Sequence, residues 1–162
     1  MTIRLPLVIG ADGLQQQLQS GDSISSPTNA PSLRAVTNGE SSAAITIGMP
    51  VYAFGADSVK RGQANAKSTA TLVGCVYDVT IAAAGTGNIA QSGVIVATTT
   101  QWDSVAGTTG GLTFATNYFL DPANPGKMTS VPPTTVGQVN VLVGRAISST
   151  EFELIMSQPI LL

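Results

Sequence analysis

Residues 140–157 read NVLVGRAISSTEFELIMS, two short apolar runs separated by Ser-Ser-Thr. In the second run Phe152 and Leu154 alternate with Glu151 and Glu153. A β-strand sends successive side chains to opposite faces, so the two apolar residues would face a core while the two acids face water. This alternation predicts a half-buried strand and indicates an all-β domain.

Short runs of the same kind recur along the chain between Gly, Pro, Asn and Asp residues, and helical periodicity is nearly missing. We therefore predict an all-β fold, a small β-barrel or sandwich with an extended N-terminal arm. The expected strands are 45–47, 51–54, 72–79, 88–97, 118–120, 127–130, 140–146 and 152–157.

One short helix is expected at TTQWDSV, residues 99–105. Thr100 can cap it, and Asp103 would then stand three residues on, near the positive end of the helix. We interpret Trp102 as a plug over the barrel. The alternative is a ligand-stacking platform, although no second aromatic residue flanks it in the sequence.

Charge is scarce, since 10% of the 162 residues are charged against about 25% in an average soluble protein. A surface with so little charge favours contact with other protein surfaces, either copies of the same chain or a larger assembly. The alternative is a neutral, Thr-rich monomer. No basic run exceeds Lys60-Arg61, so we expect no nucleic-acid partner. No apolar run is long enough to cross a membrane, and we find no signal-peptide pattern, so we expect synthesis in a cytoplasm.

Histidine is absent and Cys75 is the one cysteine. The imidazole-dependent nucleophile systems and most zinc sites therefore lack their residues, and a buried, inert thiol is expected. We predict no enzyme activity, no metal and no cofactor. Paired-carboxylate chemistry stays open in principle through five acids. They are Asp78, Asp103, Asp121, Glu151 and Glu153.

Two stretches could be taken for ligand-binding loops, and both have simpler interpretations. AAAGTGN, residues 82–88, lacks the Lys-Ser/Thr of a phosphate-binding loop, and a tight hairpin turn between two strands explains its glycines. DPANPG, residues 121–126, offers one acid where a calcium loop needs several, so Asp121 is expected to form a turn.

Residues 1–35 are predicted to be an arm and linker that precede a barrel domain of residues 36–162. The arm holds two apolar clusters joined by Asp12-Gly13, a dipeptide that favours a hairpin turn. It is too short to build a core, so its apolar residues must pack against something else, and the apolar C-terminal tail poses the same problem. The predicted partner-contact residues are Arg4, Leu5, Leu7, Val8, Ile9, Leu14, Leu18, Ile160, Leu161 and Leu162.

Residues 110–138 carry aromatic, acidic and amide residues, but their spacing is that of turns and short strands. The order GLT, YFL, a Pro-Gly turn, a Pro-Pro pair, GQ and VGRAISSTEFEL resembles small β-domains of tailed-bacteriophage virion proteins. IGMPVYAF, LVGCVYD and GNIAQSGVI fit the earlier strands of that pattern, and RLPLVIGADGLQQQLQSGDSI resembles the arm that often precedes it.

The resemblance implies a structural protein that decorates and cements a bacteriophage capsid from its outer surface, commonly as a homotrimer. Its partners would be the major capsid protein and copies of itself. The alternative is a head or tail fibre or spike component that adheres to the host surface, through loops around Trp102 or at residues 122–127. A third hypothesis, a carbohydrate-active enzyme, would depend on Asp121 or Glu153.

Overall fold

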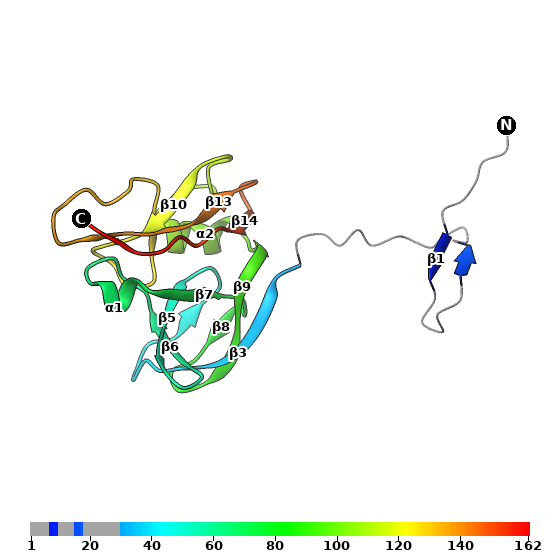
Figure 1. Ribbon diagram of the computed structural model, residues 1–162, viewed down its shortest axis with the longest axis horizontal. Coiled ribbons are helices and arrows are strands. Elements are labelled where there is room, and N and C mark those ends of the chain that lie inside the picture. Colours follow the sequence, from blue (N-terminus) through cyan, green and yellow to red (C-terminus); the bar gives the residue numbers. More distant parts are fainter. Residues whose placement is uncertain (1–6, 10–14, 18–29) are drawn as a thin grey trace.

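The computed structural model describes residues 7–9, 15–17 and 30–162. It confirms the predicted all-β class, with a closed five-stranded barrel and further strands beside it (Figure 1). The strand order around the barrel is β9-β3-β6-β5-β7, and β7 pairs again with β9 to close it. All pairs are antiparallel except β3–β6. The five strands are β3 (Ser32–Asn38), β5 (Pro50–Gly55), β6 (Ser58–Arg61), β7 (Leu72–Val76) and β9 (Thr86–Val96).

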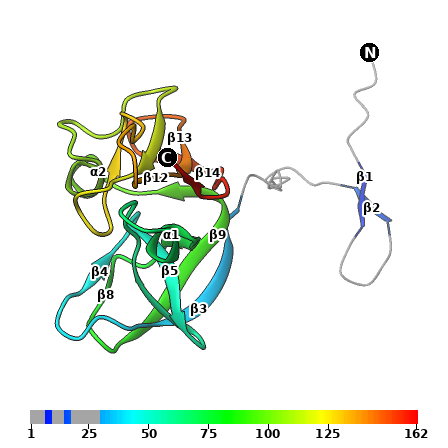
Figure 2. The ribbon, with the colours of Figure 1, turned by 60° about the vertical axis from the view of Figure 1, so that its left-hand side comes forward.

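Strand β9 belongs to both the barrel and a second sheet. Its first part pairs with β3 as far as Ser92, and from Gly93 to Val96 it pairs with β14. Gly93 has a φ of 92°, a conformation that glycine adopts at little cost. Figure 2 shows β3 and β9 side by side along one wall of the barrel. Beyond β14 (Glu151–Leu154) the second sheet continues with β13 (Leu142–Ala146), β10 (Asn117–Leu120) and β11 (Met128–Thr129).

Smaller elements complete the described part of the chain. Two short pairs, β4 with β8 and β12 with β15, lie outside the large sheet, and the N-terminal pair β1 with β2 is antiparallel. Their bounds are β1 (Leu7–Ile9), β2 (Gln15–Gln17), β4 (Ile45–Thr46), β8 (Thr80–Ile81), β12 (Val139–Asn140) and β15 (Ile160–Leu161). The helices are α1 (Lys67–Ala70) and α2 (Thr99–Ala106).

One continuous core joins the barrel to the second sheet. Trp102 of α2 is 0% exposed, and its ring centroid lies 5.4 Å from that of Phe152 on β14. On the barrel side it packs against Gly48, where an added Cβ would come within 2.5 Å of the indole. Trp102 therefore fills the junction between the two sheets, which agrees with its interpretation as a plug.

The strand predictions hold best where the apolar pattern is strong. Phe152 and Leu154 are buried while Glu151 and Glu153 are partly exposed, as predicted, although the strand ends at Leu154. Strand β3 begins at Ser32 and therefore crosses the predicted boundary between arm and barrel at 35/36. The sequence analysis missed four strands, β3, β6, β8 and β15. Charged residues interrupt the apolar pattern on β3 and β6, and β8 and β15 have only two residues each.

The predicted tight hairpin at residues 82–88 is wrong in its pairing. The chain does turn there, with the N–H of Gly85 donating to the carbonyl of Ala82 at 2.9 Å. However, β8 before the turn pairs with β4, and β9 after it pairs with β3. The turn connects two strands that lie in different sheets.

The predicted N-terminal hairpin forms in the backbone of β1 and β2, with Val8 opposite Gln16. The turn dipeptide Asp12-Gly13 lies outside the described residues. So do four of the predicted contact residues, which are Arg4, Leu5, Leu14 and Leu18.

Candidate interaction surface

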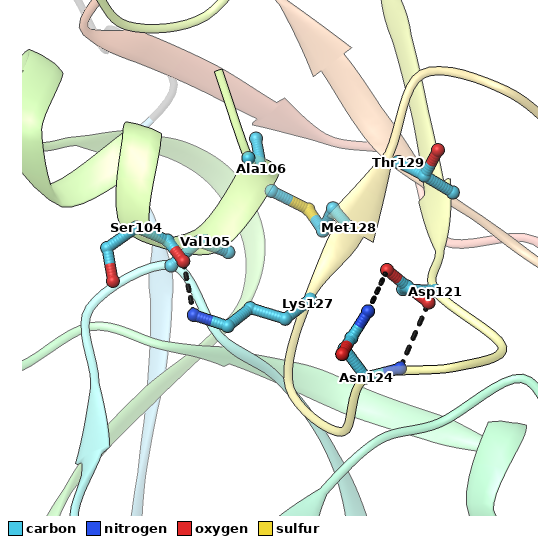
Figure 3. Close-up of a pocket in the computed structure, with 9 residues that line it drawn as sticks. Ser104, Val105, Ala106, Asp121, Asn124, Lys127, Met128 and Thr129 are labelled. Atoms are coloured by element: carbon cyan, nitrogen blue, oxygen red, sulfur yellow. Dashed lines mark hydrogen bonds between the residues drawn. The ribbon is translucent and has the colours of Figure 1, made fainter. Parts of the chain in front are cut away.

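A pocket of about 280 Å³ lies between the end of α2 and the turn that joins β10 to β11 (Figure 3). The ammonium of Lys127 donates a hydrogen bond to the carbonyl of Ser104, in the last turn of α2. A cation near the carboxyl end of a helix is favourable, because the helix dipole is negative there. The one cation of this pocket is thus engaged with the protein itself.

Asp121, on the opposite wall of the pocket, holds its own turn. One carboxylate oxygen accepts the backbone N–H groups of Ala123 at 2.6 Å and Asn124 at 3.0 Å, and the other accepts the Asn124 side-chain amide at 3.1 Å. The predicted role of Asp121 in a turn is confirmed. The two charged groups of the pocket, Lys127 and Asp121, therefore already have partners within the protein.

Asp103 holds the loop that follows α2. Its carboxylate accepts hydrogen bonds from the backbone N–H groups of Gly111 at 2.8 Å and Gly110 at 3.0 Å, and from the Thr108 hydroxyl at 2.9 Å. The Gly111 hydrogen bond is the main cause that holds the pKa of Asp103 below its ordinary value, with the other two adding to it.

The predicted cap of α2 is wrong by two residues. Thr98 caps the helix, in a reciprocal arrangement in which its side chain accepts from the N–H of Gln101 and the Gln101 side chain accepts from the N–H of Thr98. Asp103 thus lies two residues further into the helix than expected. Its carboxylate reaches forward to the loop.

We expect Asp103→Asn to lose thermal stability at neutral pH, because an amide oxygen is a weaker acceptor for three donors than a carboxylate. The pKa of Asp103 is lowered in the folded protein from its ordinary value of 3.8. Its contribution is therefore complete above that value and is lost as the pH falls through the lowered pKa. The measurement is the difference in melting temperature between the two proteins from pH 7 to pH 2. A difference that does not shrink in acid would contradict this assignment.

Two of the three remaining candidate acids have side-chain partners. Asp78 accepts the backbone N–H of Asn88 at 2.7 Å, and Glu153 lies 3.8 Å from the guanidinium of Arg145 across β13 and β14. Glu151 lines a groove described below. No group of three or more His, Cys, Asp or Glu side chains that could hold a metal occurs among the residues that the structure describes. The absence of enzyme activity remains a prediction.

Two interpretations of single residues are now decided. Trp102 is buried and its indole N–H donates to the carbonyl of Thr150 at 3.0 Å, so the ligand-stacking alternative is wrong. Cys75 is fully buried in the barrel, as predicted, and burial raises the pKa of its thiol. Across the described part of the chain, no helix is both long and apolar enough to span a membrane.

Among the predicted contact residues, the three in the C-terminal tail have exposed side chains. Ile160 and Leu161 are 62% and 63% exposed, and Leu162 is also exposed. Their backbone is nevertheless held, since the N–H of Gly137 donates to the carbonyl of Leu162 at 2.9 Å. Val136, which directly precedes Gly137, is 88% exposed. We call Val136, Ile160, Leu161 and Leu162 the C-terminal apolar edge.

A second apolar surface lies where the barrel begins. A groove of about 460 Å³ is lined chiefly by apolar residues, with one tyrosine and one acid. Its residues are Ala30, Pro31, Tyr77, Val94, Val96, Ile147 and Glu151.

The sequence analysis missed Val136 and Val96, both of which are exposed. No signal in the sequence separates an exposed valine in a loop or edge strand from a buried one, because the surroundings of each are set by chain segments far away.

We compared the chain with protein-family models, curated proteins and solved structures, and none of the three comparisons gave a match.

Proposed function

We propose that this protein is a structural component of a tailed-bacteriophage virion that decorates and stabilises the outer surface of the capsid. The observation that carries the proposal is the C-terminal apolar edge, whose side chains are exposed on a chain with few charges. Exposed apolar groups that adjoin one another mark sites of protein contact. The strand and turn pattern resembles that of virion β-domains, and this resemblance is the reason for proposing a phage capsid as the assembly.

The energetics suit a protein that is present in many copies. Burial of about 600 Å² of apolar surface per copy would contribute about 15 kcal/mol before the costs of association and ordering. Even a small net favourable free energy at each contact is then summed over the many contacts of a shell. The partners would be the major capsid protein and further copies of this chain, with a homotrimer as the proposed unit.

In this proposal the N-terminal arm binds the shell while the barrel projects outward. We expect deletion of residues 1–22 to abolish decoration of assembled shells and to leave cooperative unfolding of the barrel unchanged, because the first barrel strand begins at Ser32. Occupancy is measured by co-sedimentation with the shells. The full-length Phe114→Ser variant is the control, since Phe114 is exposed and lies far from the arm in sequence. Full occupancy by the truncated protein would refute the role of the arm.

The alternative is a fibre or spike component with host adhesion. It rested on loops around Trp102 or at residues 122–127, and the burial of Trp102 removes the first of these. The pocket beside Asp121 and Lys127 keeps the second available. Imaging of labelled protein on intact particles distinguishes the two functions, because decoration places the label over the head and adhesion places it at a fibre or tail tip.

A further inference from the structure

Strand β15 is an open sheet edge. Among the described strands it pairs with β12 alone. In this pair Val139 lies opposite Leu161, and the N–H of Val139 donates away from β15 to the carbonyl of Ala64 at 2.9 Å. Val139 and Leu161 are therefore a non-hydrogen-bonded pair, so the N–H and C=O of Leu161 point away from β12. They are a donor and an acceptor available to a further strand.

This edge has little protection against pairing. Natural edge strands usually carry charged side chains, particularly lysine, that prevent another chain from pairing with them. The tail from Ile155 to Leu162 contains no charged residue, and neither does the segment 128–144 that includes β12. Pro159 lacks an N–H and limits the open edge to a short stretch. Such an edge suits a short added strand.

The N-terminal hairpin supplies short strands of this kind. β1 and β2 have three residues each, and the sequences LVI and QQQ are uncharged. A two-stranded hairpin is marginally stable alone in water and needs a further strand or surface to persist. The hairpin thus needs a further strand or surface, and the β15 edge can accept an added strand.

The positions of the two ends favour pairing between copies. In Figure 1 the chain joins β3 on the right of the barrel, whereas the C-terminus lies on the left. A projection can shorten a separation but never lengthen it, so the root of the arm and the C-terminus are well separated across the molecule. An arm that paired with its own β15 would have to cross this separation. The arm of a neighbouring copy can approach β15 directly.

We propose that the β1–β2 hairpin of one copy adds to the β15 edge of a second copy by strand-to-strand hydrogen bonds. The contact joins two different surfaces, so repetition closes a ring when the rotation between copies permits it. This mode of self-association goes beyond the capsid role, and it would hold whatever larger assembly the protein joins.

The test is disulfide crosslinking between two variants of the full chain. Val8→Cys and Leu161→Cys are purified separately in reduced form, mixed, and oxidised. The native Cys75 does not compete, because it is fully buried and burial raises the pKa of its thiol. We expect a mixed dimer of Val8→Cys with Leu161→Cys to form at least about tenfold faster than one of Val8→Cys with Phe114→Cys, since binding raises the local concentration of the paired thiols. Phe114 is 73% exposed, so its cysteine provides an accessible control.

Two results would overturn the proposal. The first is equal crosslinking rates for the two mixtures, which would mean that the hairpin does not bind preferentially at β15. The second comes from the double variant Val8→Cys/Leu161→Cys. If it forms a crosslinked monomer at a rate independent of concentration, the arm pairs with its own chain. The assay contains no capsid, so its failure is separate from a failure of shell decoration.

Discussion

Replacement of Trp102 by alanine should lower the free energy of unfolding by about 3–5 kcal/mol, as is usual when a large aromatic side chain leaves a packed core. Trp102 is 0% exposed and contacts Phe152 on β14 of the second sheet and Gly48 in the turn that precedes barrel strand β5. The truncation would leave a cavity where the barrel meets the second sheet. It would also leave the carbonyl of Thr150 without the indole N–H that it now accepts.

The loss is measured by urea denaturation followed by circular dichroism, because Trp102 is the only tryptophan and its removal eliminates the tryptophan fluorescence. Two variants calibrate the result. Trp102→Phe keeps an aromatic ring and should lose less. Phe114→Ala removes an exposed ring and should change stability by less than about 0.5 kcal/mol. A Trp102→Ala protein as stable as Phe114→Ala would show that the indole does not join the two sheets.

Asn38→Asp should destabilise the barrel by more than about 3 kcal/mol at neutral pH. Asn38, at the end of β3, is a buried polar residue, and its side-chain amide donates to the carbonyls of Ala43 at 2.9 Å, Ile81 at 3.0 Å and Ala82 at 3.1 Å. An ionised aspartate has no donor and would place a buried negative charge against three carbonyl oxygens.

The effect of Asn38→Asp should diminish in acid. A carboxyl group in this position is disfavoured in its charged form, so its stability cost is lowest at low pH and grows as the pH rises. Melting temperatures of the wild type and the variant at pH 3 and pH 7 measure this. Asn65→Asp is the matched control, because Asn65 is exposed and its side-chain oxygen accepts the Thr69 hydroxyl, a role that a carboxylate can keep. If Asn38→Asp and Asn65→Asp proved equally stable, the hydrogen bonds of the Asn38 side chain would not link β3 to β8 in a way that matters for stability.

The sequence was most informative where local chemistry decides the structure. Alternation of Phe152 and Leu154 with acids predicted a half-buried strand, and the apolar run around Cys75 predicted a buried thiol. The Asp121 turn was also predictable, because an aspartate that accepts hydrogen bonds from the next backbone groups needs no distant partner. These features depend on neighbours within a few residues.

The errors have a common physical cause. The glycines at 82–88 predict a turn correctly but do not reveal that β8 pairs with β4 and β9 with β3. Asp103 suits a helix start by composition, yet Thr98 makes the cap and Asp103 holds the loop after the helix. In both cases several local solutions satisfy the hydrogen bonds, and packing of distant segments selects one.

The sequence by itself determined the all-β class, the scarcity of charge and the absence of imidazole chemistry, because these follow from residue types and short-range alternation. Only the tertiary structure decided that five strands close into a barrel, that β9 continues into a second sheet, and that Trp102 fills the junction. It also decided that the C-terminal backbone is paired while its apolar side chains remain exposed. Strand partners and exposure depend on segments far apart in the chain, and local sequence does not specify which of them meet.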